Sequence, residues 1–356
     1  MREWVVICDF FVNFVVIKHL CDKIVYDFTI GNRRDLMKKN NVFSLKNFIN
    51  ELRATLKGEY NRAVWPIAGF TLLFCAIGAL LAYFLMMLSS SMMMNVMMVM
   101  YGMASPAAIL MALLEIVLVF VLMILNGFWY SFIGTAFNFA YLDRFRDESQ
   151  KVSAASIWSQ FKHMNKNQVL RVVLYISLFM FLWTLPLTIV ADLFARNRVI
   201  YIICQVANQV ILAWKGLEYS QSLFLYKDTR PQFLGQSMRH ALTASRRYMG
   251  GFKRYLLLMA VCVILLPLLV WDVIFGGLAY YGIYTATSFC IWLGFLLAFF
   301  GDLAYVPVVS AATALFYHQT SDKRDLKQVF ADTFKPVAEL TGQADAQEDK
   351  KDKAKK

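Results

Sequence analysis

Charged residues are scarce in this chain of 356 residues, because only 17% are Asp, Glu, Lys or Arg while 59% are hydrophobic. A water-soluble protein of this length needs a larger charged surface, so the composition argues against a soluble enzyme or a soluble binding domain. Several runs of roughly 18 or more residues carry almost no charge, and each can cross ~30 Å of hydrocarbon as a helix. The sequence therefore predicts an all-α, polytopic membrane helix bundle.

Residues that carry catalytic or metal chemistry are also few. The chain has 4 histidines and 6 cysteines, and it contains no CxxC, HxxxH, HExxH, Walker A or GxSxG pattern. We therefore expect no bound cofactor and no metal. One alternative stays open, a three-histidine metal site, because His163, His240 and His318 share the expected cytoplasmic side of the membrane.

Positive charge is the one excess among the ionisable residues, with a net charge of +12. The Lys and Arg residues fall between the apolar runs and not in a continuous basic domain. This placement predicts that they fix the membrane topology and contact anionic lipid headgroups. We expect no nucleic-acid partner, and the sequence leaves the oligomeric state open.

The apolar runs predict six membrane spans. A Met-dense, uncharged loop is expected over 89–106, and its thioethers would suit Cu(I). The apolar run from Ala107 to Leu142 is too long for one crossing. Prolines within the spans are expected to kink the helices. We expect residues after Gly127 to lie along the inner surface, with aromatic side chains at headgroup depth (Trp129, Tyr130 and Tyr141). The expected spans are Val64–Leu88, a span from Ala107, Val172–Ala191, a span from Val199 to Trp214 and beyond, Tyr255–Phe275, and a span within Ile283–His318.

A short amphipathic helix precedes each outward-going span, and we call these three segments elbows. The first elbow is Ser44–Gly58, with Ser44 as cap and Gly58 as terminator, and the second is Ser153–Asn165. The third runs from Asp228 or Thr229 through Pro231 to Gly250-Gly251. We expect its apolar face to lie on the membrane and its basic face to bind headgroups, through Arg239, Arg246, Arg247, Lys253 and Arg254.

The distribution of Lys and Arg predicts the orientation. These residues gather before span 1 and in the loops after spans 2 and 4, whereas the links after spans 1 and 5 have none. Both termini are therefore expected in the cytoplasm. We interpret 1–36 as an extension upstream of a natural start at Met37, 37–319 as the membrane domain, and 320–356 as a charged, disordered cytoplasmic tail. The elbow–hairpin units read as possible internal repeats.

Charges inside the spans are the best candidates for function, because burying a charge in hydrocarbon costs several kcal/mol unless it is paired or hydrated. Helix rise places Glu115 ~12 Å from the outer end of span 2, with no evident partner. Lys215, Glu218 and Asp302 are expected to form a cluster near the inner surface. Glu115 is the candidate proton or cation site.

The third elbow resembles an uncharacterised bacterial integral membrane family, domain-of-unknown-function family 975. The family motif is matched by Ala241, Ser245, Arg246, Met249, Gly251 and Lys253, and a preceding stretch is matched by Tyr219, Ser220, Tyr226, Asp228 and Pro231. The closing Phe-Tyr of the family corresponds to Phe316-Tyr317, so the resemblance covers roughly residues 42–319. It implies a cytoplasmic membrane protein of bacteria. Some members carry a β-carotene monooxygenase label, but the family brings no agreed functional residues.

Three functions follow from these patterns. The first is a non-enzymatic protein of the bacterial cytoplasmic membrane, with an envelope or lipid-associated role. The second is a small transporter that uses Glu115. The third is an intramembrane, metal-dependent oxygenase built on the three histidines.

Overall fold

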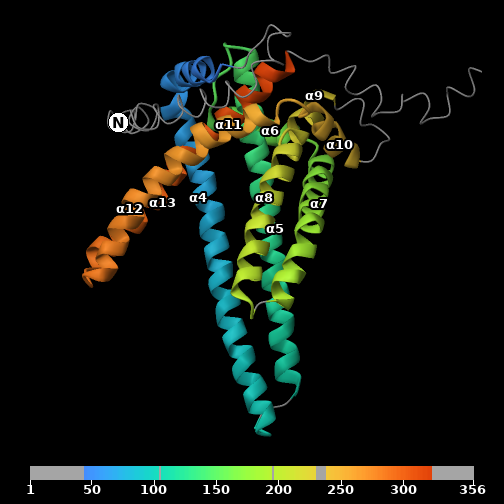
Figure 1. Ribbon diagram of the computed structural model, residues 1–356, viewed down its shortest axis with the longest axis vertical. Helices are drawn as coiled ribbons and strands as arrows, with labels where there is room; N and C mark the ends of the chain where they lie inside the picture. The colour runs from blue at the N-terminus through green and yellow to red at the C-terminus, as the bar shows by residue number, and fades with distance from the viewer. Residues whose placement is uncertain (1–43, 104–105, 195, 230–237, 323–356) are drawn as a thin grey trace, which may run out of the picture.

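The computed structural model describes residues 44–103, 106–194, 196–229 and 238–322 (Figure 1). The expectations for residues 1–36, for Pro231 and for the tail beyond 322 lie outside these ranges. Within them every regular element is helical, and six helices are long and apolar enough to cross a membrane. In chain order the elements are α4 (Leu45–Met100), α5 (Pro106–Arg146), α6 (Ala154–His163), α7 (Lys166–Leu193), α8 (Arg198–Tyr219), α9 (Ser222–Thr229), α10 (Arg239–Tyr248), α11 (Lys253–Met259), a π-helical stretch (Ala260–Leu265), α12 (Leu266–Tyr284) and α13 (Ser288–Ser321).

The long helices form three antiparallel hairpins that diverge from a common head (Figure 1). The hairpins are α4–α5, α7–α8 and α12–α13, and the two helices of each pair contact one another. Contacts between hairpins are concentrated at the head, where the inner part of α13 packs on α4 and α5. Most side chains of the spans are left exposed by the chain itself. The predicted all-α bundle of six spans is confirmed, and its outer surfaces are available to lipid.

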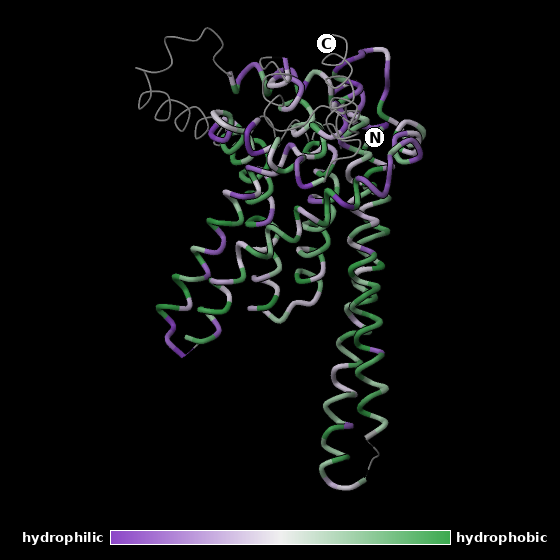
Figure 2. Tube along the Cα trace, turned by 90° about the vertical axis from the view of Figure 1, so that its right-hand side faces the viewer, coloured by the Kyte–Doolittle hydropathy of each residue, from purple (hydrophilic) through white to green (hydrophobic). Residues whose placement is uncertain are grey.

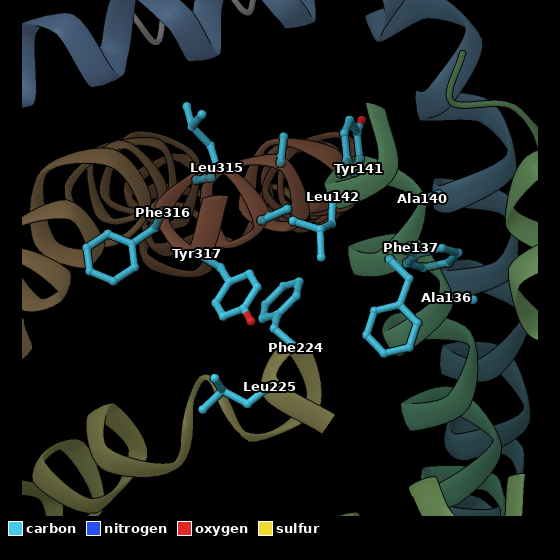
Figure 3. Close-up of a cluster of buried hydrophobic side chains, with 14 of the residues drawn as sticks. Ala136, Phe137, Ala140, Tyr141, Leu142, Phe224, Leu225, Leu315, Phe316 and Tyr317 are labelled. Carbon is cyan, nitrogen blue, oxygen red and sulfur yellow. The ribbon is translucent and has the colours of Figure 1, made fainter. Parts of the chain in front are cut away.

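The hydrophobic core lies in the head and not between the spans. Tyr141, Tyr248, Tyr317, Phe137 and Phe316 are among its fully buried side chains. Figure 3 shows Tyr317 against Phe224, where the two rings stack with centroids 5.0 Å apart. The head is therefore a packed unit, built from the inner ends of the spans together with the short helices.

The three elbows contribute their apolar faces to this core, which corrects the expectation that they lie on the membrane. The buried side chains come from the start of α4, from α6 and from α10, and they are Leu45, Phe48, Leu52, Ile157, Phe161, Ala241, Leu242, Ala244 and Tyr248. An amphipathic pattern records that one face is apolar, but it does not record whether lipid or protein covers that face. Here protein covers it.

The first hairpin differs most from expectation. Helix α4 continues through Gly58 and through the Met-dense segment to Met100, so neither a break nor a long loop is present. Its first turns lie across the head in Figure 1 before the helix turns toward the tip. At 56 residues it is ~84 Å long, more than twice the thickness of a bilayer core. Charge-free, Met-rich sequence has no helix breaker before Gly102, so the helix persists.

The inner end of α5 is also a correction. The helix is continuous from Pro106 to Arg146, and its stretch from Phe132 to Leu142 supplies the centre of the head core. Tyr141 is 1% exposed and so does not lie at a headgroup boundary, whereas Trp129 and Tyr130 are exposed as expected. The apolar run exceeds one crossing because its second half is covered by protein.

Candidate functional site

Glu115 lies in the outer part of the first hairpin, near the start of α5. The register of the first hairpin is set by the Phe74–Tyr130 ring contact and by Asn126, whose Nδ2 donates to the Phe74 carbonyl at 3.1 Å. Counting outward equally along both helices brings Glu115 opposite Ser89, ~36 Å from Trp65 at the inner end. Glu115 is exposed on the outer part of the first hairpin, and its depth in a membrane depends on the tilt of that hairpin.

Glu218, near the inner end of α8, accepts three side-chain hydrogen bonds. Lys215 Nζ lies 3.0 Å and Lys253 Nζ 2.6 Å from its carboxylate oxygens, and Trp214 Nε1 donates at 3.1 Å. We call these four residues the Glu218 clamp. Its carboxylate is 6% exposed, and Ser245 Oγ adds a bond to the Glu218 carbonyl at 2.7 Å. The clamp therefore ties α8 to α10 and α11.

Each lysine of the clamp is also covered by an indole ring. Lys215 Nζ lies 4.1 Å from the ring centroid of Trp183, and Lys253 Nζ lies 4.7 Å from that of Trp214. Cation–π contacts of this kind stabilise partly desolvated cations. The two lysines and one glutamate leave one net positive charge near the inner boundary. Asp302, the other expected member, is exposed on α13, where the charge of Asp272 in α12 acts on it.

Lys253 is the member of the clamp that sequence reasoning assigned elsewhere. The Lys215–Glu218 contact is local, three residues along one helix, and was predicted from that spacing. Lys253 reaches the same carboxylate from a residue 35 positions away. The sequence showed only a cation before span 5, and no local signal points to its partner.

A second charged connection joins the ends of α5, α9 and α13. Arg146 donates to both carboxylate oxygens of Asp228, at 2.8 and 2.6 Å, and the Tyr317 hydroxyl donates to the same carboxylate at 2.6 Å. We call this the Asp228 joint. Beside it, Lys227 pairs with Asp143, which also accepts from Gln160 Nε2 at 2.7 Å. Asp228 and Tyr317 belong to the family-like motifs, so their visible role is to hold the head together.

Removing the charge of Asp228 should loosen the head. We expect Asp228→Asn to lower the free energy of unfolding by about 2 kcal/mol, because hydrogen bonds to charged groups contribute about 1.5–3 kcal/mol and Arg146 is partly exposed. Tyr317→Phe removes one of the three bonds and should cost about half as much. Equilibrium unfolding in mixed micelles measures both. Equal stability of Asp228→Asn and the wild type would contradict a structural role.

Exposed arginines mark the places where the outward-going helices leave the head. They are Arg62 in α4, Arg171 in α7 and Arg254 in α11, and we call them the collar. Each lies within a few residues of a buried side chain of its helix, namely Ile67, Val172 and Leu256. Exposed indoles accompany them, with Trp65 67% and Trp214 54% exposed. Arginine with tryptophan is the composition of a membrane–water boundary.

The basic elbow residues are divided between two roles. Lys253 is held in the Glu218 clamp, whereas Arg246, Arg247 and Arg254 are exposed on the surface of the head. Arg239 is exposed as well, and its guanidinium lies 5.6 Å from the ring centroid of Phe179 in α7. The basic face of α10 is therefore presented outward although its apolar face is buried.

The three histidines of the oxygenase hypothesis do not form a ligand set. Nδ1 of His163 bonds with the carbonyl oxygen of Ser159 at 2.8 Å, and His318 stacks on Phe145 with centroids 6.4 Å apart. No group of three or more His, Cys, Asp or Glu side chains with metal-binding geometry occurs in the described ranges. The geometry offers the oxygenase hypothesis no support.

The site is thus a boundary rather than a cavity: a packed, charge-clamped head, a collar of arginines beneath it, and exposed apolar hairpins. Comparison with known proteins adds no relative, since no family model, no curated protein and no solved structure matches this chain.

Proposed function

We propose that this multi-spanning membrane protein is a non-enzymatic, lipid-associated scaffold of a bacterial cytoplasmic membrane, with its head resting on anionic headgroups. The observation that carries the proposal is the collar. Arg62, Arg171 and Arg254 lie on three separate helices, all exposed at the boundary between the head and the spans. Phosphate groups of anionic lipids are the ligands that guanidinium groups at this level would meet.

The burial of the elbows supports the same function. If their apolar faces lay in the membrane, the protein would bind lipid through hydrophobic insertion. Those faces are covered by the head core, so the exposed contribution of α10 is its basic side, with Arg246 and Arg247. Attraction to the membrane surface is then mainly electrostatic, and its strength falls with ionic strength.

The proposed orientation places the head in the cytoplasm. Lys and Arg residues gather on the head side of the molecule, and the positive-inside rule assigns that side to the cytoplasm. Membership of the bacterial family suggested by the third elbow fits this scheme, because the residues of its motif support the head: Asp228 and Tyr317 form the joint, and Ser245 and Lys253 bind Glu218.

Anionic lipid should stabilise the protein, and the collar should account for most of the effect. We expect Arg171→Gln combined with Arg254→Gln to remove most of the rise in melting temperature that phosphatidylglycerol gives in neutral detergent, because a ligand stabilises only through the sites it binds. Melting is measured in detergent with phosphatidylglycerol or phosphatidylcholine added.

The matched control is Lys46→Gln combined with Lys151→Gln. Both lysines are exposed on the head, one in the first turn of α4 and one beyond the inner end of α5, and the net charge changes equally. This variant should keep the full response to phosphatidylglycerol. Equal losses in both variants would show a diffuse charge effect, and an unchanged response in the collar variant would sink the proposed role of the collar.

A further inference from the structure

The third hairpin belongs to the head core along its inner part only. The buried side chains that it adds to that core extend outward to Val263 on one helix and to Tyr305 on the other. Figure 1 shows the outer part pointing away from the first hairpin, and in Figure 2 the two also stand apart below the head. We call this outer part, residues 268–302, the arm.

The two helices of the arm are held together as one body. A Cβ added to Gly282 or to Gly294 would lie 2.6 Å from the backbone of the other helix, so the backbones nearly touch. Nearer the head, Trp271 Nε1 donates to the carbonyl oxygen of Leu297 at 3.0 Å. Close backbone packing and a hydrogen bond between the helices are what stabilise pairs of membrane helices. Any movement of the arm is therefore a movement of both helices at once.

Both helices are irregular where the arm joins the head. The π-helical stretch Ala260–Leu265 is followed at once by Pro267, and α13 contains Pro307. Proline has no N–H to donate to the carbonyl four residues earlier, so the Val263 carbonyl lacks its α-helical partner. The Tyr305 hydroxyl of α13 donates to that oxygen instead, which brings the two irregular turns side by side. Helices bend at prolines and at π-bulges, and we call this level the pivot.

Tyr60 of α4 ties the pivot to the first hairpin. This tyrosine is 5% exposed, and its hydroxyl donates to the carbonyl oxygen of Ala304 at 2.7 Å. Ala304 lies three residues before Pro307, so the bond ends within the irregular turn of α13. A single neutral hydrogen bond contributes modestly to stability, so it can hold an angle between two helices without locking it.

We infer that the third hairpin is a hinged arm: residues 268–302 turn as one body about the pivot, and the Tyr60 hydroxyl is the catch that holds their angle to the head. The edge of the head core, the irregular turns of both helices and the catch all fall within a few residues of one another. Membrane helices accommodate bilayers of different thickness by tilting, and the pivot confines that tilt to one hairpin while the head stays packed. The inference goes beyond the proposed scaffold, because the pivot and the collar use different residues.

Distances between two spin labels test the hinge. One label replaces Tyr284 at the tip of the arm and the other replaces Lys162 on the head, both exposed, and ketone-bearing side chains carry them so that the native cysteines remain. Residues 267–284 rise ~26 Å, so a change of ~20° at the pivot, the size of a sharp kink, moves the tip by ~9 Å. In phosphatidylcholine nanodiscs we expect one narrow distance distribution without further change. Tyr60→Phe should give a broader distribution that includes distances displaced by about that amount.

Two further variants separate the catch from the pivot. Tyr248→Phe is the matched control, because it removes the hydroxyl of another buried tyrosine, which donates to Thr320 Oγ1 at 2.6 Å within the head, and its distribution should stay narrow. Pro267→Ala combined with Pro307→Ala restores both N–H groups, so adding this pair to Tyr60→Phe should narrow the distribution again. An unchanged distribution in Tyr60→Phe, or equal broadening in Tyr248→Phe, would overturn the catch. Breadth that persists after both prolines are replaced would overturn the pivot.

Discussion

Replacing Glu218 with alanine should destabilise the protein by about 3–5 kcal/mol, the usual cost of removing one partner from a buried ion pair. The carboxylate is 6% exposed, and its loss strands two lysines that are 14% and 23% exposed. It also removes the acceptor of the Trp214 indole N–H. Equilibrium unfolding by SDS in mixed micelles should report the change, and α8, α10 and α11 should separate first.

Two further variants identify the cause of that loss. Glu218→Gln keeps an acceptor for Trp214 but removes the charge, so it should recover only part of the stability. Glu218→Gln combined with Lys215→Met should be more stable than Glu218→Gln alone, because one stranded cation is gone. If Glu218→Ala costs less than about 1 kcal/mol, the clamp behaves as a solvent-screened surface pair, and the head must be held by its apolar core.

The spans could be read from the sequence because a membrane imposes a local condition on composition. The charge-free runs from Val64, Ala107, Val172 and Val199 all became long helices. The ends were less predictable: Gly58 does not stop α4, and the Met-dense segment is helical to Met100. Helix continuation depends on the absence of strong breakers, and a flexible apolar composition gives no signal for either outcome.

The contacts of the Glu218 clamp also differ in how far the sequence predicts them. Lys215 and Glu218 are one helical turn apart, so their pairing follows from spacing, whereas Lys253 is brought to Glu218 by the fold. The expected partner Asp302 was chosen by depth along an assumed vertical span, whereas the cations that pair with Glu218 are Lys215 and Lys253. Depth counted along a helix is reliable only when tilt is known.

The close packing of the third hairpin was not predictable either, and it leads to a second large effect. Gly294 of α13 lies so near α12 that an added Cβ would be 2.6 Å from the backbone nitrogen of Ala279 and from the carbonyl oxygen of Phe275. Gly282 makes the reciprocal approach, 2.6 Å from the backbone nitrogen of Ile291. Backbones at such distances cannot yield as a flexible side chain can. Small residues are what allow this contact between membrane helices.

We therefore expect Gly294→Val to force α12 and α13 apart and to cost about 3 kcal/mol, the upper range for overpacking. Gly277→Val is the matched control, since it makes the same substitution on the same hairpin where nothing lies within 4 Å. SDS unfolding should separate the two, with Gly277→Val close to the wild type.

Crosslinking between α12 and α13 gives a second measurement. A cysteine pair at Ala279 and Gly294 would itself replace the glycine, so it cannot report on Gly294→Val. A cysteine pair at Trp271 and Leu297 can, because the Trp271 indole N–H donates to the Leu297 carbonyl oxygen at 3.0 Å. Its yield should fall in Gly294→Val and persist in Gly277→Val. Unchanged crosslinking and stability in Gly294→Val would mean that the hairpin can accommodate the larger side chain, and that lipid, rather than helix contact, holds α12 beside α13.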